Sequence, residues 1–133
     1  MDNFILTVCL CGSWFVKSDI LTIITRNVQV GKGSVFVSVW NDEKTFLKKP
    51  FTELSEKADG DTLVFLFVLP EGQYAISAYQ DLNDNKKLDL GIFGIPKEPI
   101  GFGNNFRPKM SAPKFRDCAI DLSQSMAEEI ELK

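Results

Sequence analysis

Hydrophobic and polar residues alternate along most of the chain, with the period of two that strands with one buried face show. The alternating runs are residues 20–25, 34–40, 73–80, 115–122 and 128–132. Residues 62–69 are instead apolar on both faces, as expected of a central strand in a two-layer packing. Because no long amphipathic helix separates these runs, the pattern predicts an all-β fold. We expect an antiparallel, immunoglobulin-like or transthyretin-like β-sandwich of about seven strands, with a small barrel as the alternative.

Glycine, proline and acidic residues mark the connections between these runs. Residues 26–33 contain two glycines and predict a hairpin connection between the first two strands. Residues 45–61 are less regular and predict either cover for a sheet edge or one short helical turn. Pro70 and Gly72 predict a tight turn, since proline fixes φ and glycine accepts a positive φ.

The start of the chain is continuously apolar and lacks the alternation seen in most of the other runs. Residues 4–16 are an apolar run, shorter than the roughly 20 residues that a helix needs to span a bilayer. The run has the length of a secretory h-region, although Asp2 places a negative charge where a signal peptide carries Lys or Arg. We expect residues 1–18 to be a signal-peptide-like leader of an exported, periplasmic or envelope protein. The alternatives are a buried first strand and a retained membrane-proximal anchor.

Length, charge and residue composition limit the number of domains, the kinds of partner and the catalytic mechanisms that the chain can have. A length of 133 residues favours one domain, which we place at residues 19–133, with no transmembrane span after removal of the leader. The net charge is −3 and the basic residues are scattered, so nucleic acid is not an expected partner. The chain has no histidine, which excludes Ser-His and Cys-His mechanisms. We therefore expect a protein that is not an enzyme, has no catalytic residues and keeps Cys118 as a small buried apolar side chain.

Oxygen-bearing side chains recur after the strand predicted at residues 73–80. Calcium-binding loops of the EF-hand type supply oxygens from positions one, three, five, seven (a backbone carbonyl) and nine. Counting from Asp81 gives a candidate Ca²⁺ site, in which Glu98 folds back to replace the missing ligand at position twelve. Its candidate ligands are Asp81, Asn83, Asn85, the Lys87 carbonyl, Asp89 and Glu98.

Two features of the same loop argue against tight binding. Ile92 occupies position twelve, and Lys86 stands where such loops require glycine. A site of this kind would bind calcium weakly, in the millimolar range of extracellular modules. The alternative is a purely structural loop, in which the Asp and Asn side chains form Asx-turns with nearby backbone N–H groups.

The glycine- and asparagine-rich residues 91–105 suggest a second kind of site. Phe93, Phe102 and Asn104 could together form a shallow surface for a sugar or a peptide. Its partner would be an envelope protein or a glycan. The alternative is that the phenylalanines fill the end of the sandwich, which is the commoner use of this residue.

Three motifs in order give the chain a family resemblance. They are a G-x-Y-A strand at residues 72–75, a D-x-N-x-N-x-x-x-D loop at 81–89, and a G-I-P-x-E-x-x-G-F-x-N run at 94–104. A P-x-F element follows at 113–115. Over residues 20–122 the chain resembles the bacterial domain of unknown function 2141 family. The resemblance implies an exported sandwich without an established activity. Lys86 and Gly103 replace the glycine and serine that the family usually has there.

Overall fold

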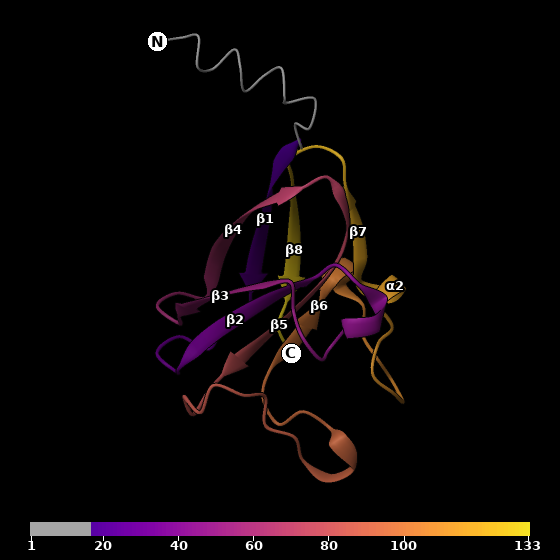
Figure 1. The fold of residues 1–133 in the computed structure, drawn as a ribbon. Helices are drawn as coiled ribbons and strands as arrows, with labels where there is room; N and C mark the ends of the chain where they lie inside the picture. Colours follow the sequence, from indigo (N-terminus) through magenta and orange to yellow (C-terminus); the bar gives the residue numbers. More distant parts are fainter. Residues whose placement is uncertain (1–16) are drawn as a thin grey trace, which may run out of the picture.

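Two β-sheets that pack face to face make up the fold of the computed structural model, which describes residues 17–133 (Figure 1). The strands are β1 (Ser18–Arg26), β2 (Ser34–Trp40), β3 (Thr52–Lys57), β4 (Thr62–Pro70), β5 (Gly72–Asp81), β6 (Ile100–Phe102), β7 (Ala119–Leu122) and β8 (Met126–Glu131). The short helices are η1 (Glu43–Thr45), η2 (Ile92–Gly94), η3 (Gly103–Asn105) and α2 (Phe115–Cys118). The predicted all-β sandwich is confirmed.

The two sheets differ in size and connectivity. The three-stranded sheet has the order β4-β1-β8, and the five-stranded sheet has the order β3-β2-β5-β6, with β7 pairing to the first half of β5. Strand pairs are antiparallel except for β1 and β8, which run parallel. The described part of the chain therefore holds eight strands, one more than the pattern predicts.

Period-two alternation places one side of each sheet in a shared core. In the three-stranded sheet, Leu21 lies opposite Phe67 and Ile23 lies opposite Phe65, and all four side chains are buried. They pack against the inward residues of the five-stranded sheet, which are Val35, Val37, Val39, Ile76 and Ala78. Each buried side chain of this size contributes about 1.5–3 kcal/mol, so this core is the main source of stability.

The predicted hairpin between the first two strands is wrong. β1 pairs with β4 and β8, whereas β2 pairs with β3 and β5, so residues 27–33 cross from one sheet to the other. Val28 is buried in the core near the start of this crossing. Gly33 ends it with a φ of +61°, and a Cβ there would lie 1.7 Å from the Asp81 carbonyl oxygen. Glycine is therefore required at the position where the crossing meets the end of β5.

The prediction of a central strand at residues 62–69 is also wrong. β4 lies at the edge of its sheet and pairs only with β1 in the described part of the chain. Phe65 and Phe67 point into the core, but Val64, Leu66 and Val68 are 55%, 60% and 70% exposed. A run that is apolar on both faces does not by itself show that both faces are covered.

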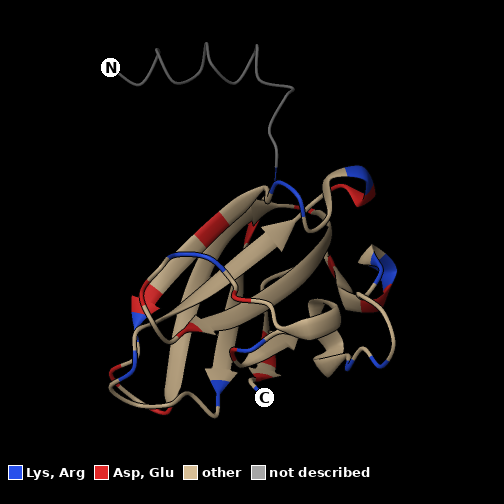
Figure 2. Cartoon of the chain, turned by 90° about the horizontal axis from the view of Figure 1, so that it is seen from below, with Lys and Arg blue, Asp and Glu red and all other residues tan. Residues whose placement is uncertain are grey.

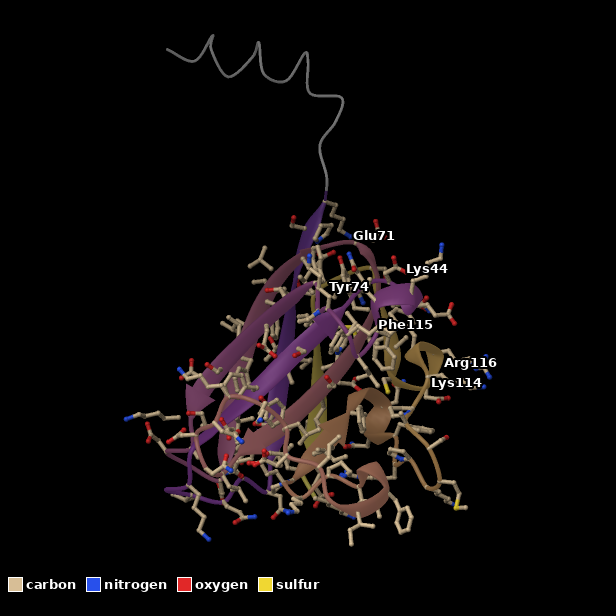
Figure 3. All side chains as sticks on the ribbon, turned by 60° about the horizontal axis from the view of Figure 1, so that its bottom comes forward. Lys44, Glu71, Tyr74, Lys114, Phe115 and Arg116 are labelled. Carbon is tan, nitrogen blue, oxygen red and sulfur yellow. The ribbon has the colours of Figure 1, made fainter. Side chains whose placement is uncertain are left out.

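The secondary structure of residues 45–61 and 115–118 also differs from the one that the pattern predicts. The first segment contains β3, which is itself an edge strand paired with β2, whereas the pattern predicts only cover for an edge or a helical turn there. The second is the single helical turn α2 instead of the start of a strand. Phe115 points from α2 toward the sheet, whereas Lys114 and Arg116 point away from it (Figure 3).

A second apolar cluster lies between α2 and the five-stranded sheet. It contains Trp40, Ala75, Phe102, Phe115 and Cys118. Cys118 is fully buried, as predicted, and this burial raises the pKa of its thiol to about 12. At neutral pH the thiol is therefore protonated and unreactive as a nucleophile.

A tyrosine fixes the corner between β4 and β5. Only Glu71 separates the two strands, which belong to different sheets, so a one-residue bend stands where the pattern predicts a tight turn, and Gly72 has no positive φ. The Tyr74 hydroxyl donates a hydrogen bond of 2.6 Å to the Pro70 carbonyl oxygen, and burial raises the pKa of this hydroxyl. The bond resembles the tyrosine corner of other β-sandwiches, in which a hydroxyl bonds to backbone a few residues upstream.

Charged residues of both signs are interspersed around the sandwich (Figure 2). This arrangement agrees with the scattered basic residues of the sequence. Of the helices within residues 17–133, none has the length and hydrophobicity that would let it cross a membrane.

Candidate functional site: the acidic loop

The acidic loop, residues 81–98, begins where β5 ends. Asp81 is buried and lies opposite Ser34 of β2, so the strand pairing fixes its position. Its carboxylate accepts hydrogen bonds from the backbone N–H groups of Asn85, at 3.2 Å, and Lys86, at 2.7 Å. One side chain thus organises the first turn of the loop, in the manner of an Asx-turn.

Two asparagines continue this pattern and then contact Asp89. The Asn83 side-chain oxygen accepts from the Asn85 N–H at 3.3 Å, and the Asn85 oxygen accepts from the Lys87 N–H at 3.2 Å. Their NH₂ groups donate to the two carboxylate oxygens of Asp89, at 2.7 Å from Asn83 and 2.6 Å from Asn85. Asp89 is thereby held by hydrogen bonds that favour its charged form.

The pKa of Asp89 should report on these bonds. It lies below the ordinary value of 3.8, first because of the hydrogen bond from Asn85 and then because of the bond from Asn83. A lowered carboxyl pKa gives stability above the ordinary pKa that is lost as the pH falls through the folded value. We expect an NMR titration to place Asp89 below 3.8 in the protein, and Asn85→Ala to raise it. An unchanged Asp89 titration in Asn85→Ala would contradict this contact.

Glu98 closes the base of the loop. Its side chain is only 6% exposed, and its two oxygens accept from the Leu82 N–H at 2.8 Å and the Asp89 N–H at 3.0 Å. Glu98 therefore folds back onto the loop and joins its beginning to Asp89 through backbone N–H groups, while its role as a calcium ligand stays a prediction. A backbone hydrogen bond of 2.9 Å from the Lys97 N–H to the Asp89 carbonyl also joins the two ends of this part of the loop.

These contacts bring the six predicted ligands into one closed loop. The carboxylate oxygens of Asp81 and Glu98 accept one backbone hydrogen bond each, and an ionised oxygen has room for a second partner. The NH₂ groups of Asn83 and Asn85 face Asp89, so an ion would require both amides to turn their oxygens inward. Within residues 17–133, no three His, Cys, Asp or Glu side chains form a group that could hold a metal ion. Calcium binding therefore depends on amide and carbonyl oxygens and stays a prediction.

A family profile described as "Uncharacterized protein conserved in bacteria (DUF2141)" matches residues 23–130. The chain belongs to the DUF2141 family. No curated protein and no solved structure matches it significantly. The resemblance drawn from the three motifs is therefore confirmed, and the acidic loop is one of the features that carry it.

The departure from the DUF2141 pattern at Lys86 has a structural cost. Lys86 adopts a φ of +63°, a left-handed conformation that a residue with a Cβ occupies at about 1–2 kcal/mol. We expect Lys86→Gly to raise the free energy of unfolding by about 1 kcal/mol in urea titrations. Lys87→Gly is the matched control, because residue 87 lacks a positive φ, and it should not stabilise the protein. Equal effects of the two substitutions would show that strain at Lys86 is unimportant.

The far end of the loop is apolar and exposed. Phe93 is 95% exposed, and Leu90, Ile92 and Ile95 around it are exposed as well. We call these four residues the apolar tip. The tip includes η2 and projects from the end of the sandwich beyond the acidic residues (Figure 1). Large apolar side chains gathered on a projecting loop are typical of a contact surface.

The structure does not bring Phe102 and Asn104 together with Phe93 on this surface. Phe102 is buried in the second apolar cluster. The Asn104 side chain donates to the carbonyl oxygens of Asp117 in α2 and Ala119 in β7, at 3.3 Å and 3.0 Å, and so joins η3 to both elements. Gly103, one of the glycines that suggested an open loop, is instead closely packed. A Cβ at this position would lie 2.3 Å from the Cys118 carbonyl oxygen.

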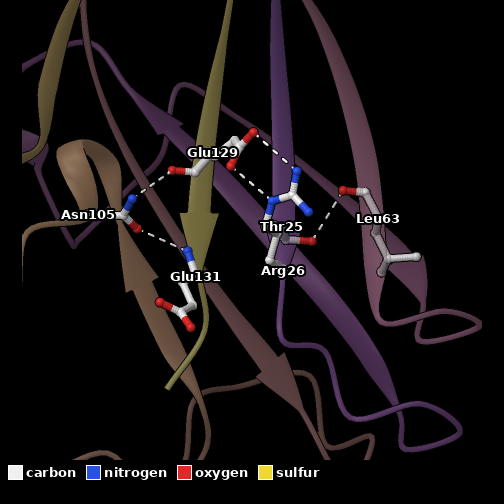
Figure 4. Close-up of polar contacts among 6 residues, drawn as sticks. All are labelled: Thr25, Arg26, Leu63, Asn105, Glu129 and Glu131. Atoms are coloured by element: carbon white, nitrogen blue, oxygen red, sulfur yellow. Dashed lines mark hydrogen bonds and ion pairs between the residues drawn. The ribbon is translucent and has the colours of Figure 1, made fainter.

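A cavity of about 520 Å³ lies at a place that the sequence does not indicate. Its lining residues are Arg26, Asn27, Val28, Asp61, Thr62, Asn105, Glu129 and Glu131. Arg26 donates to both carboxylate oxygens of Glu129, at 2.9 Å and 3.2 Å (Figure 4). These bonds join residues 103 positions apart, so no local pattern could predict them. The pair is exposed, so solvent and salt screen it and it adds little to stability.

Proposed function

We propose that this DUF2141 protein is an exported, non-catalytic module of the cell envelope that holds a weakly bound calcium ion in the acidic loop. One observation carries the calcium proposal: all six candidate ligands lie in a single loop that Glu98 closes at its base. The absence of histidine from the sequence supports a non-catalytic role. Export is supported by the apolar residues 4–16, which lie outside the described residues.

Calcium in this loop would act by stiffening it. The ion would draw Asn83 and Asn85 together with Asp81 and so fix the apolar tip relative to the sandwich. Affinities of extracellular calcium modules are about 10⁻⁴–10⁻³ M, which matches a site with few carboxylates. The module would then present an ordered apolar tip to an envelope protein only where calcium is abundant.

Thermal unfolding tests the calcium proposal. A ligand that binds only the folded state at ten times its dissociation constant stabilises it by about 1.4 kcal/mol. We expect calcium at that concentration to raise the midpoint by about 5 °C relative to chelator. Asp81→Asn should abolish the shift. Asp84→Asn removes the same charge from an exposed neighbour outside the ligand set and should retain it. A midpoint that is equal in calcium and chelator would contradict the proposal.

Export has a separate test. Cells that express the full chain are fractionated, and the N-terminal residue of the purified protein is determined. We expect a periplasmic or surface fraction and an N-terminus near residues 17–19, as removal of a leader requires. A cytosolic protein that retains Met1 would contradict export and leave the calcium proposal untouched.

A second function, carbohydrate or peptide binding, is favoured by the exposure of Phe93. An exposed aromatic ring is a common platform for such ligands because its apolar face contributes large contact area. Binding of soluble peptidoglycan fragments, followed by tryptophan fluorescence or calorimetry, tests this function. Phe93→Ala should abolish binding, whereas Met110→Ala removes an equally exposed apolar side chain elsewhere and should not. Equal binding by both variants would exclude the tip as the ligand site.

A further inference from the structure

The edges of the two sheets are protected in different ways. At the edge of the five-stranded sheet, β3 carries Glu53, Glu56 and Lys57, and charged side chains discourage another strand from pairing. At one edge of the three-stranded sheet, the Asn105 side chain accepts from the Glu131 N–H at 3.0 Å and donates to the Glu129 carbonyl at 3.2 Å (Figure 4). Asn105 thus occupies the hydrogen-bonding positions that a further strand beside β8 would use.

The β4 edge has neither protection. From Thr62 to Pro70 the strand contains no charged residue, and its backbone pairs only with β1. The Thr25 hydroxyl, which donates to the Leu63 carbonyl at 3.4 Å, also comes from β1 (Figure 4). Within residues 17–133 no strand pairs with the outer side of β4, and the one contact at the end of this strand is the Tyr74 hydroxyl on the Pro70 carbonyl. A long apolar edge of this kind is a template for pairing with another strand.

The sequence of β4 indicates which strand pairs with it. Residues 63–69 read Leu-Val-Phe-Leu-Phe-Val-Leu, which is the same in both directions about Leu66. In an antiparallel pair related by a two-fold axis at Leu66, Val64 lies opposite Val68 of the second copy. Phe65 then lies opposite Phe67 of the second copy, and Leu66 lies opposite Leu66. Each apolar residue therefore meets one of matching size on the same face of the sheet.

We propose that β4 is a self-association surface, and that its occupant is the β4 strand of a second copy of this chain. Pairing about Leu66 joins two three-stranded sheets into one six-stranded sheet and continues the core across the two-fold axis through Phe65 and Phe67. The contact is isologous, so it closes as a dimer and leaves no β4 edge for further growth.

The expected dimer is weak and sensitive to charge at its ends. One strand pair buries less than the roughly 800 Å² per partner of a standard stable interface. In the register centred on Leu66, Asp61 of one copy lies opposite Glu71 of the other, because both residues stand five positions from the centre. These like charges oppose each other at both ends, so association should strengthen as added salt screens them.

Sedimentation velocity of the full chain over a range of concentrations tests the proposal. We expect a monomer–dimer equilibrium that Leu66→Lys weakens at least tenfold, since it places two ammonium groups opposite each other at the axis. Val30→Lys is the control, because it adds the same charge at an exposed apolar position outside β4. Far-UV circular dichroism of each variant confirms that the sandwich is folded. A wild-type chain that stays monomeric, as it would if residues 1–16 covered β4, overturns the proposal, as does a dimer that Leu66→Lys leaves intact.

A charge reversal tests the register. Glu71→Lys would turn the two end contacts with Asp61 into opposite-charge pairs and should strengthen the dimer roughly threefold to tenfold at low salt. Glu56→Lys changes the net charge equally but lies on β3, in the other sheet, and should have a smaller effect. Equal effects of the two variants would overturn pairing about Leu66.

Discussion

Replacing Gln80 with alanine is expected to lower the free energy of unfolding by about 3 kcal/mol. The Gln80 side chain is fully buried at the end of β5 and makes three hydrogen bonds to the crossing between β1 and β2. Its oxygen accepts from the Gln29 N–H at 2.8 Å, and its NH₂ group donates to the carbonyls of Gln29 and Lys32, at 2.8 Å and 2.7 Å. Alanine would leave all three backbone groups without these partners and would open a cavity in addition.

Urea titration of Gln80→Ala measures this loss. Gln73→Ala is the matched control, since Gln73 lies on the same strand with an exposed side chain, and its change should stay within about 0.5 kcal/mol. Equal stabilities of the two variants would show that the crossing, and with it the position of Gly33 against Asp81, does not depend on Gln80.

Glu98→Ala is expected to cost about 2–3 kcal/mol, the second-largest effect among these substitutions. The substitution removes the charged acceptor of two backbone N–H groups, at Leu82 and Asp89, and bonds to charged acceptors are stronger than neutral ones. We also expect the loop to loosen, so that hydrogen exchange of the Leu82 and Asp89 amides becomes faster.

A graded comparison separates this role from a general effect of charge. Glu98→Gln keeps one acceptor oxygen and should lose about half as much stability as Glu98→Ala. Glu56→Ala removes an exposed glutamate of β3 and should be nearly neutral. Unchanged exchange at Leu82 and Asp89 in Glu98→Ala would contradict a closing role for Glu98.

The local sequence pattern was sufficient to predict the fold class and the turns of the acidic loop. Period-two alternation identified β1, β2, β5 and β8 because only one face of each lies in the core, as for Leu21 and Ile23, but it did not indicate β3 or β6. The loop was also predictable, since the contacts of Asp81 reach only four and five residues along the chain. Gly91 and Gly94, which lie between Asp89 and Glu98, allow the sharp bends by which Glu98 folds back.

Sheet membership was not predictable from the same signals. The glycines at 31 and 33 fit a hairpin as well as a crossing between sheets, and the two are distinguished by long-range strand pairing, which a local pattern does not report. The apolar outer face of β4 looked like that of a central strand, because periodicity does not report what covers a face. Asn105 and Arg26 both contact Glu129 of β8, which lies 24 residues from Asn105 and 103 residues from Arg26 in the sequence. No local spacing indicates contacts over such separations.

A crystal structure of the protein soaked in about 10 mM calcium, well above the expected dissociation constant, tests the central claim most directly. The account predicts one ion in the acidic loop, bound by Asp81, Asp89, the turned amide oxygens of Asn83 and Asn85, and the Lys87 carbonyl. Glu98 should supply the sixth ligand from the base of the same loop. A loop without an ion, in which the Asn83 and Asn85 NH₂ groups still donate to Asp89, would contradict it.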